Sequence, residues 1–165
     1  MESGNDDEDG QNLYFLHGTS LRTWGRSIAI DPEAGRGDFG YGFYTFADDE
    51  EGRTWASDRA VQASHGLIDL PVVIGVKISV AEFARLSRID FRDPRYAPGW
   101  KQFVKDCRAG RRRYAYKDVV IGPVSDGSVD NPSVHSAITI PQYKFEAGGA
   151  DKLKFAFVYP AGPSE

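Results

Sequence analysis

Two stretches of the sequence decide the fold: LYFLHGT at residues 13–19 and DFGYGFYT at residues 38–45. Each is a short apolar run that is typical of a buried β-strand, and each carries one group suited to contacting a ligand, His17 in the first and Tyr44 in the second. Glycine beside both groups lets a ligand approach the backbone closely. The two runs therefore predict two core strands whose ends meet one small ligand.

The composition is that of an ordinary globular protein. The chain has 165 residues, of which 41% are hydrophobic and 27% charged, and this is enough apolar material for one packed core. Its formal charge of −4 disfavours sequence-independent binding to nucleic acid or to anionic membranes, which requires an excess of basic side chains. We therefore expect a small molecule or a protein as the partner, with no membrane and no nucleic acid.

The ends of the chain differ from its middle. Residues 1–11 are polar and acidic, so we expect a disordered tail there, followed by a single domain over residues 12–160 and a C-terminal tail at 161–165. The acidic start does not fit a signal peptide, and no apolar run reaches the roughly 18 to 20 residues of a membrane span. These features predict a cytoplasmic protein as encoded.

Periodicity and capping residues predict the elements. Strands are expected at 13–17, 42–46, 72–80, 118–124, 142–145 and 153–159, and loops at 31–42 and 125–133. Helices are expected at 21–27, 49–63 and 81–86, with a further helix that buries the face carrying Trp100, Phe103, Val104 and Cys107. Strands outnumber helices and do not alternate with them regularly, which predicts an α+β fold rather than a doubly wound parallel sheet.

Several common types of site are disfavoured. The three histidines, His17, His65 and His135, have no carboxylate or cysteine at ligand spacing, so no metal is expected. The single cysteine, Cys107, excludes an internal disulfide and falls on a helix face predicted to be buried. The glycines before Phe43 precede a strand, whereas dinucleotide loops follow a strand and open a helix.

Four short motifs resemble, in order, the landmarks of the DUF3990 family. They are LYFLHGTS at 13–20, GDFGYGFYT at 37–45, DVVIGPV at 118–124 and QYKF at 142–145. That family is grouped with the ADP-ribosyltransferase superfamily, in the branch whose three strand motifs supply a histidine, a tyrosine and a third residue that is Glu, Asp or Gln. The resemblance implies a split mixed or antiparallel β-sheet core with short flanking helices.

The resemblance also implies a site for NAD as substrate, without a metal. His17 would bind the adenosine-side ribose, the Gly18 backbone the nicotinamide carboxamide, and Tyr44 would stack on the nicotinamide ring. Gln142 would hold the nicotinamide ribose and so complete a catalytic set of His17, Tyr44 and Gln142. The other residues implied to contact NAD are Thr19, Asp38, Phe39 and Gly40.

Gln142 departs from the glutamate that many such transferases have. An amide cannot take up a proton at neutral pH, which disfavours the usual modification of arginine and leaves water or a strong nucleophile as acceptor. Glu146 shares a strand face with Gln142 and is a candidate for meeting the acceptor. The roles of Asp126 and of the basic run from Arg108 to Arg113 stay open, the run being either solvated surface or a site for a pyrophosphate or an acidic partner.

Three functions remain at this point. The first is transfer of ADP-ribose to a macromolecular acceptor, with protein as the expected class. The second is hydrolysis of NAD by water, and the third is a non-catalytic nucleotide-binding or interaction module. Relatives of this kind are often toxin or effector domains, so the resemblance also implies delivery into a target cell and an immunity or chaperone protein as a partner.

Overall fold

The structure is a computed structural model that describes residues 11–27, 30–32, 35–64, 69–128, 130–136 and 138–161. The predicted tails, apart from Gln11 and Ala161, lie outside these residues. The chain divides into two compact units, the first comprising residues 1–29, 47–86 and 152–165 and the second comprising 30–46 and 87–151. Strands pair mostly antiparallel and helices are short, which confirms the predicted α+β class.

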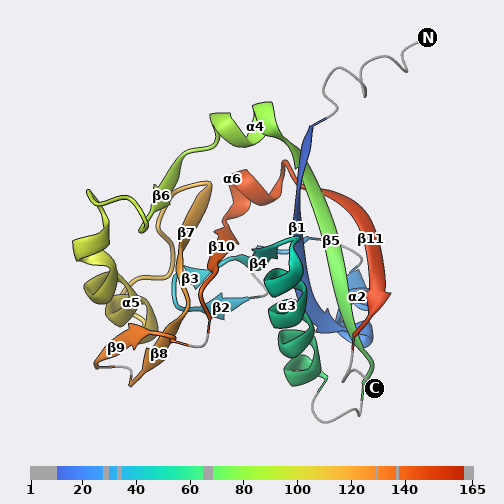
Figure 1. Ribbon diagram of the computed structural model, residues 1–165, viewed down its shortest axis with the longest axis horizontal. Helices are drawn as coiled ribbons and strands as arrows, with labels where there is room; N and C mark the ends of the chain where they lie inside the picture. The colour runs from blue at the N-terminus through green and yellow to red at the C-terminus, as the bar shows by residue number, and fades with distance from the viewer. Residues whose placement is uncertain are drawn as a thin grey trace. The chain divides into compact units, whose positions relative to one another are not determined.

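The first unit is built on three antiparallel strands (Figure 1). The central strand β5 (Pro71–Ser79) pairs with β1 (Asn12–Ser20) on one side and with β11 (Lys154–Pro160) on the other. Residues 71–76 of β5 are all buried, as expected for an apolar strand with a neighbour on each side. The helices of this unit are α2 (Leu21–Ser27), α3 (Glu50–Ala63) and α4 (Val80–Arg85).

Side-chain caps explain where these helices begin. The Ser20 hydroxyl accepts a hydrogen bond from the Thr23 amide at 3.1 Å, which confirms the predicted start of α2. Asp49 caps α3 by accepting from the Gly52 amide at 2.7 Å, and Ser79 caps α4. Local sequence therefore sets the helix starts in the first unit.

Helix α3 packs closely on β1 because small residues meet at the contact. Its buried residues are Gly52, Ala56 and Ala60, and a Cβ added at Gly18 would overlap the carbonyl oxygen of Ala56. Gly18 thus faces α3, and strand alternation directs its neighbour His17 to the opposite face of the sheet.

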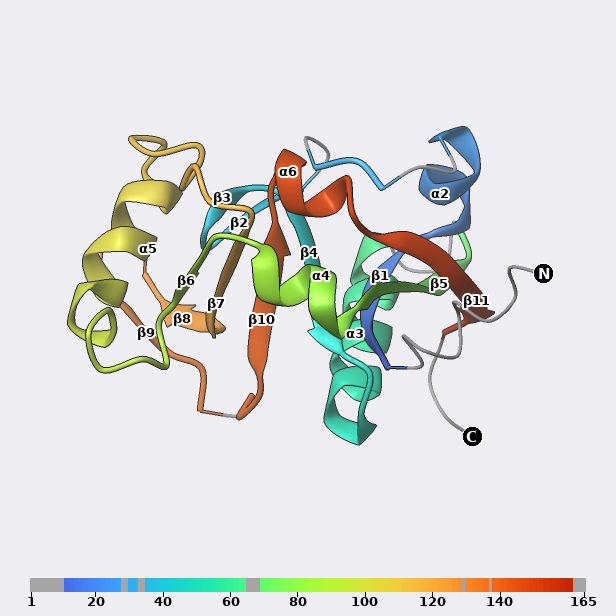
Figure 2. The same cartoon turned by 90° about the horizontal axis from the view of Figure 1, so that it is seen from above.

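In the second unit, the main sheet has the strand order β4-β10-β7-β6 (Figure 2). β10 (Pro141–Phe145) pairs antiparallel with β4 (Phe43–Ala47) and β7 (Val119–Pro123), and β6 (Arg88–Asp90) runs parallel to β7. Its helices are the 3-10 turn η1 (Ala97–Gly99), α5 (Trp100–Arg108) and α6 (Ala147–Ala150).

The core of the second unit forms around α5. Its four predicted apolar positions are all buried, which confirms the helical face expected from their spacing. They pack with Phe39, Phe91, Ala115 and Val120. The rings of Phe39, Phe91 and Phe103 lie 5.1 to 5.9 Å apart at tilted angles, a favourable arrangement for aromatic pairs.

Both predicted long loops contain a small hairpin. The strands β2 (Arg36–Gly37) and β3 (Gly40–Tyr41) pair within the first loop, and β8 (Ser125–Gly127) and β9 (Pro132–Val134) pair within the second. Gly40 and Gly127 have positive φ angles of 85° and 83°, which the bends require. Among the described residues, no helix is long and apolar enough to cross a membrane.

Replacing Gly18 by alanine should destabilise the protein by about 1–3 kcal/mol or more, because the added methyl group meets α3 backbone rather than a mobile side chain. Chemical denaturation measures the loss. Gly99→Ala is the matched control, since nothing lies within 4 Å of a Cβ at that position. Equal stability of the two variants would contradict the close packing of α3 on β1.

Candidate functional site

The carboxylate of Asp38 joins four segments of the second unit. Its Oδ1 accepts from Nε and Nη2 of Arg108, at 3.2 and 3.1 Å, on helix α5. Its Oδ2 accepts from the Ser125 amide at 2.8 Å, on β8, and from Nε2 of Gln142 at 3.0 Å, on β10. Both oxygens of Asp38 thus accept hydrogen bonds from the protein, and one of these bonds holds Gln142 in place. Its predicted contact with NAD stays a prediction.

Gln142 is buried, at 4% exposure, and its orientation is fixed by Asp38. A carboxylate only accepts hydrogen bonds, so the nitrogen of the amide must face Asp38. No partner of the carbonyl oxygen Oε1 is present among the described residues. The oxygen is thus the atom that Gln142 can offer to a hydroxyl donor.

Tyr44 lies on the same face of the sheet as Gln142. In the pairing of β4 with β10, Tyr44 is opposite Lys144 and Phe46 is opposite Gln142, so these side chains share one face. The structure therefore brings together two of the three predicted catalytic residues, from segments far apart in the sequence.

The β2–β3 hairpin folds onto Tyr44. The Tyr44 hydroxyl accepts from the Phe39 amide at 2.9 Å and donates to the Gly40 carbonyl, and a Cβ at Gly37 would contact the Tyr44 ring. Burial raises the pKa of Tyr44 well above its ordinary value, and the bond from Phe39 only partly opposes this shift. The phenol therefore stays protonated, and its two hydrogen bonds hold the β2–β3 hairpin against Tyr44.

The other predicted NAD contacts have different surroundings. Phe39 is fully buried in the aromatic core, and Gly40 closes the hairpin. His17, Gly18 and Thr19 belong to the first unit, where they pair with residues 72–74 of β5. Thr19 is buried, whereas His17 is half-buried.

A buried ion pair begins two residues after Gln142, at Lys144 of β10. Lys144 is completely buried and its ammonium contacts Oε2 of Glu146. Glu146 also accepts from the Ala115 amide through Oε2 at 2.6 Å and from the Tyr116 amide through Oε1 at 2.9 Å. Burial lowers the pKa of Lys144, and the bond to Glu146 counteracts this shift.

These contacts indicate that Glu146 stabilises the fold. Both of its oxygens are occupied and its side chain is shielded from solvent, which argues against the suggested contact with an acceptor. Sequence reasoning missed the pair with Lys144. The only signal was two opposite charges at alternate positions of a strand, which place both side chains on one face.

The comparison with family models decides the family. The model for DUF3990, described as a protein of unknown function, matches residues 13–144. The chain belongs to the DUF3990 family. The searches of curated proteins and of solved structures found no match. The match spans all three predicted catalytic residues of this DUF3990 protein and ends at Lys144.

The basic run of this DUF3990 protein is used largely within the fold. Arg108 binds Asp38, Arg111 pairs with Asp106 at 3.2 Å, and the guanidinium of Arg112 lies 5.2 Å from the centre of the Phe103 ring. Arg113 contributes its carbonyl, which accepts from the Tyr41 amide at 2.7 Å. These contacts give most of the run a role within the fold, which neither of the two predicted alternatives included.

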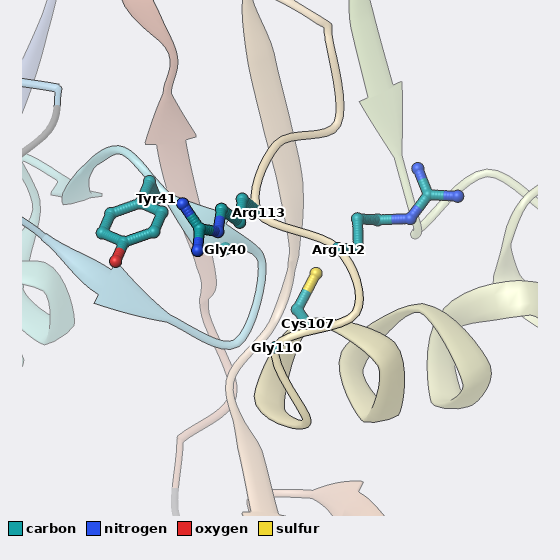
Figure 3. A pocket seen from close by; sticks show the side chains of 6 residues that line it. All are labelled: Gly40, Tyr41, Cys107, Gly110, Arg112 and Arg113. Carbon is teal, nitrogen blue, oxygen red and sulfur yellow. The ribbon is translucent and has the colours of Figure 1, made fainter.

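A small pocket of about 80 Å³ lies beside this run (Figure 3). Its lining consists of Gly40, Tyr41, Cys107, Gly110, Arg112 and Arg113. In Figure 3 the Arg113 side chain lies beside Tyr41, whereas that of Arg112 points to the other side. Burial raises the pKa of Cys107 to about 11, so the thiol in this lining is a poor nucleophile.

Metal binding receives no structural support from the described residues, which hold no group of three or more His, Cys, Asp or Glu side chains suited to a metal ion. His65 lies outside them. Asp126 is exposed on β8 and accepts from the Gly127 amide at 2.8 Å. A reaction without metal stays a prediction.

Lys144→Met should destabilise the protein by about 3–5 kcal/mol, because it leaves the Glu146 carboxylate buried without its cation. Denaturation of Lys144→Met and of the double variant with Glu146→Gln measures this, and the double variant should recover part of the loss. Arg53→Met, which breaks the exposed pair with Asp48, is the control and should change little. A Lys144→Met protein as stable as the control would contradict the buried pair.

The Cys107 thiol should resist an aromatic disulfide reagent at pH 8 in the native protein. With a pKa of about 11, roughly one thiol in a thousand is ionised at that pH, and the side chain is 1% exposed. The signal is unambiguous because the chain has one cysteine. Denaturant should release the full reaction within minutes, while rapid reaction without denaturant would refute the burial.

Proposed function

We propose that this DUF3990 protein is an NAD-consuming enzyme of the ADP-ribosyltransferase superfamily. It cleaves the bond between nicotinamide and ribose and transfers ADP-ribose to a macromolecular acceptor. The observation that carries the proposal is the placement of Tyr44 and Gln142 on one sheet face, with the Gln142 amide oriented by Asp38. Membership of the family and the order of its motifs add support.

The chemistry needs little more than positioning. When the C1′–N bond breaks, its electron pair moves to the positively charged nicotinamide, which leaves neutral, and the ribose gains oxocarbenium character. A hydrogen bond from a ribose hydroxyl to Oε1 of Gln142 would hold the sugar and stabilise that charge. The Tyr44 ring would stack on nicotinamide.

The acceptor completes the reaction by forming a bond to C1′ and losing a proton. Two carboxylates of the second unit lie near Gln142 in space or in sequence, those of Asp38 and Glu146. Both accept hydrogen bonds from protein donors. Neither is free to act as a base. This observation favours NAD hydrolysis as the second candidate function, because water releases its proton to solvent once it has added to the cation.

Gln142→Ala should lower the rate of nicotinamide release by roughly 100-fold or more, as expected when one group that stabilises developing charge is removed. Mass spectrometry of the protein incubated with NAD and candidate acceptors measures nicotinamide, free ADP-ribose and labelled protein. Gln102→Ala is the matched control, since Gln102 is exposed and contacts Asp106 on the same helix.

The products separate the candidates. Labelled protein indicates transfer, and free ADP-ribose alone indicates hydrolysis. Calorimetric binding of NAD without release of nicotinamide would overturn both enzymatic functions and leave a non-catalytic nucleotide-binding module. Equal loss of activity in Gln142→Ala and Gln102→Ala would refute the assigned role of Gln142.

Tyr44 has two roles that conservative substitution can separate. Tyr44→Phe keeps the aromatic ring but loses the hydrogen bonds to Phe39 and Gly40. Tyr44→Ala loses the ring as well as these hydrogen bonds. If stacking is the larger contribution, NAD affinity should fall at least tenfold more in the alanine variant than in the phenylalanine variant. Calorimetry measures this difference, and equal losses would assign the effect to the hairpin.

A further inference from the structure

A basic groove lies at one end of the first unit, apart from every residue assigned to NAD. Its volume is about 530 Å³, and it is lined by Lys77, Arg85, Lys152, Lys154, Glu82 and Asn12, among others. Its lining residues come from the end of β5, from α4 and from the start of β11, elements that are labelled in Figure 1. Four cations and one carboxylate thus gather around a single concave surface.

The pairing of β11 with β5 places two of these cations, Lys77 and Lys154, in directly opposite positions. Lys154 on β11 is directly opposite Lys77 on β5, so both side chains project from the same face. Like charges in directly opposed positions repel and lower the stability of a sheet. An anion between these ammonium groups would remove that cost.

Among the described residues, no acidic side chain forms a salt bridge with Lys77 or Lys154. None of the four cations takes part in an ion pair there, although Glu82 lines the same groove. The chain as a whole has more acidic than basic residues, 24 against 20, so the cluster is a local concentration of positive charge.

We propose that the basic groove binds a compact anion that carries two or more linked phosphate groups. Lysine ammonium groups bind phosphate oxygens as point charges, and Arg85 adds a planar set of donors. Several linked phosphates match several converging cations, whereas one carboxylate would leave most of them unpaired. The net charge of −4 favours a compact ligand over a long nucleic-acid strand.

Calorimetry with inorganic tripolyphosphate at low salt tests the proposal. The wild type should bind with one site, and Lys77→Gln combined with Lys154→Gln should raise the dissociation constant at least tenfold. The control combines Lys101→Gln and Lys117→Gln, two exposed lysines of the second unit, and removes the same charge. The control should stay within twofold of the wild type.

Thermal unfolding gives a second readout that does not depend on enzymatic activity. Without ligand, Lys154→Gln should unfold at the same or a higher temperature than the wild type, because repulsion from Lys77 is relieved. Tripolyphosphate should raise the unfolding temperature of the wild type and have a much smaller effect on this variant. If the double variant fails to fold, Lys152→Gln with Arg85→Gln replaces it in both measurements.

The same titration with a nucleoside triphosphate in place of tripolyphosphate shows whether the groove binds the phosphates alone or a nucleotide. Equal affinity means that the phosphates alone are bound, and tighter binding means that the nucleoside is contacted as well. Absence of saturable binding at millimolar tripolyphosphate would overturn the proposal, as would equal weakening in the double variant and the control. Tighter binding of single-stranded RNA than of either compact anion would also overturn it.

Discussion

The second unit depends on one carboxylate. Asp38 accepts hydrogen bonds from residues that follow it by 70, 87 and 104 positions, and so ties the hairpin to a helix, a second hairpin and a core strand. Four donors around one mostly buried acid form a network in which each bond restrains the others. The orientation of Gln142, on which the proposed chemistry depends, is a consequence of this network.

A second buried charged group lies on β10, the strand that carries Gln142. Lys144 and Glu146 satisfy each other, and Glu146 also holds the turn at Tyr116, whose φ of 58° is unusual for a residue with a side chain. The first unit is held differently, by small residues that let α3 approach β1 at Gly18. Polar cross-links position the candidate site residues of the second unit, whereas close packing fixes the first.

Much of the fold was predictable because its signals are local. The helix at 100–108 follows from apolar spacing, and the helices predicted at 21–27 and 49–63 agree closely with α2 and α3, which Ser20 and Asp49 cap in the structure. The hairpins at 36–41 and 125–134 were predicted as loops, because strands of two or three residues carry no periodic signal. The strand at 88–90 was missed for the same reason, since it forms by pairing with distant residues of β7.

The sequence by itself determined the α+β class, most elements, the DUF3990 resemblance and the position of Tyr44 and Gln142 on core strands. Tertiary structure alone decided what those side chains contact. The bond from Gln142 to Asp38 and the burial of Glu146 with Lys144 have no signal in the local sequence. Periodicity and caps act over a few residues and can be read along the chain, but hydrogen bonds between residues a hundred positions apart exist only after the strands have paired.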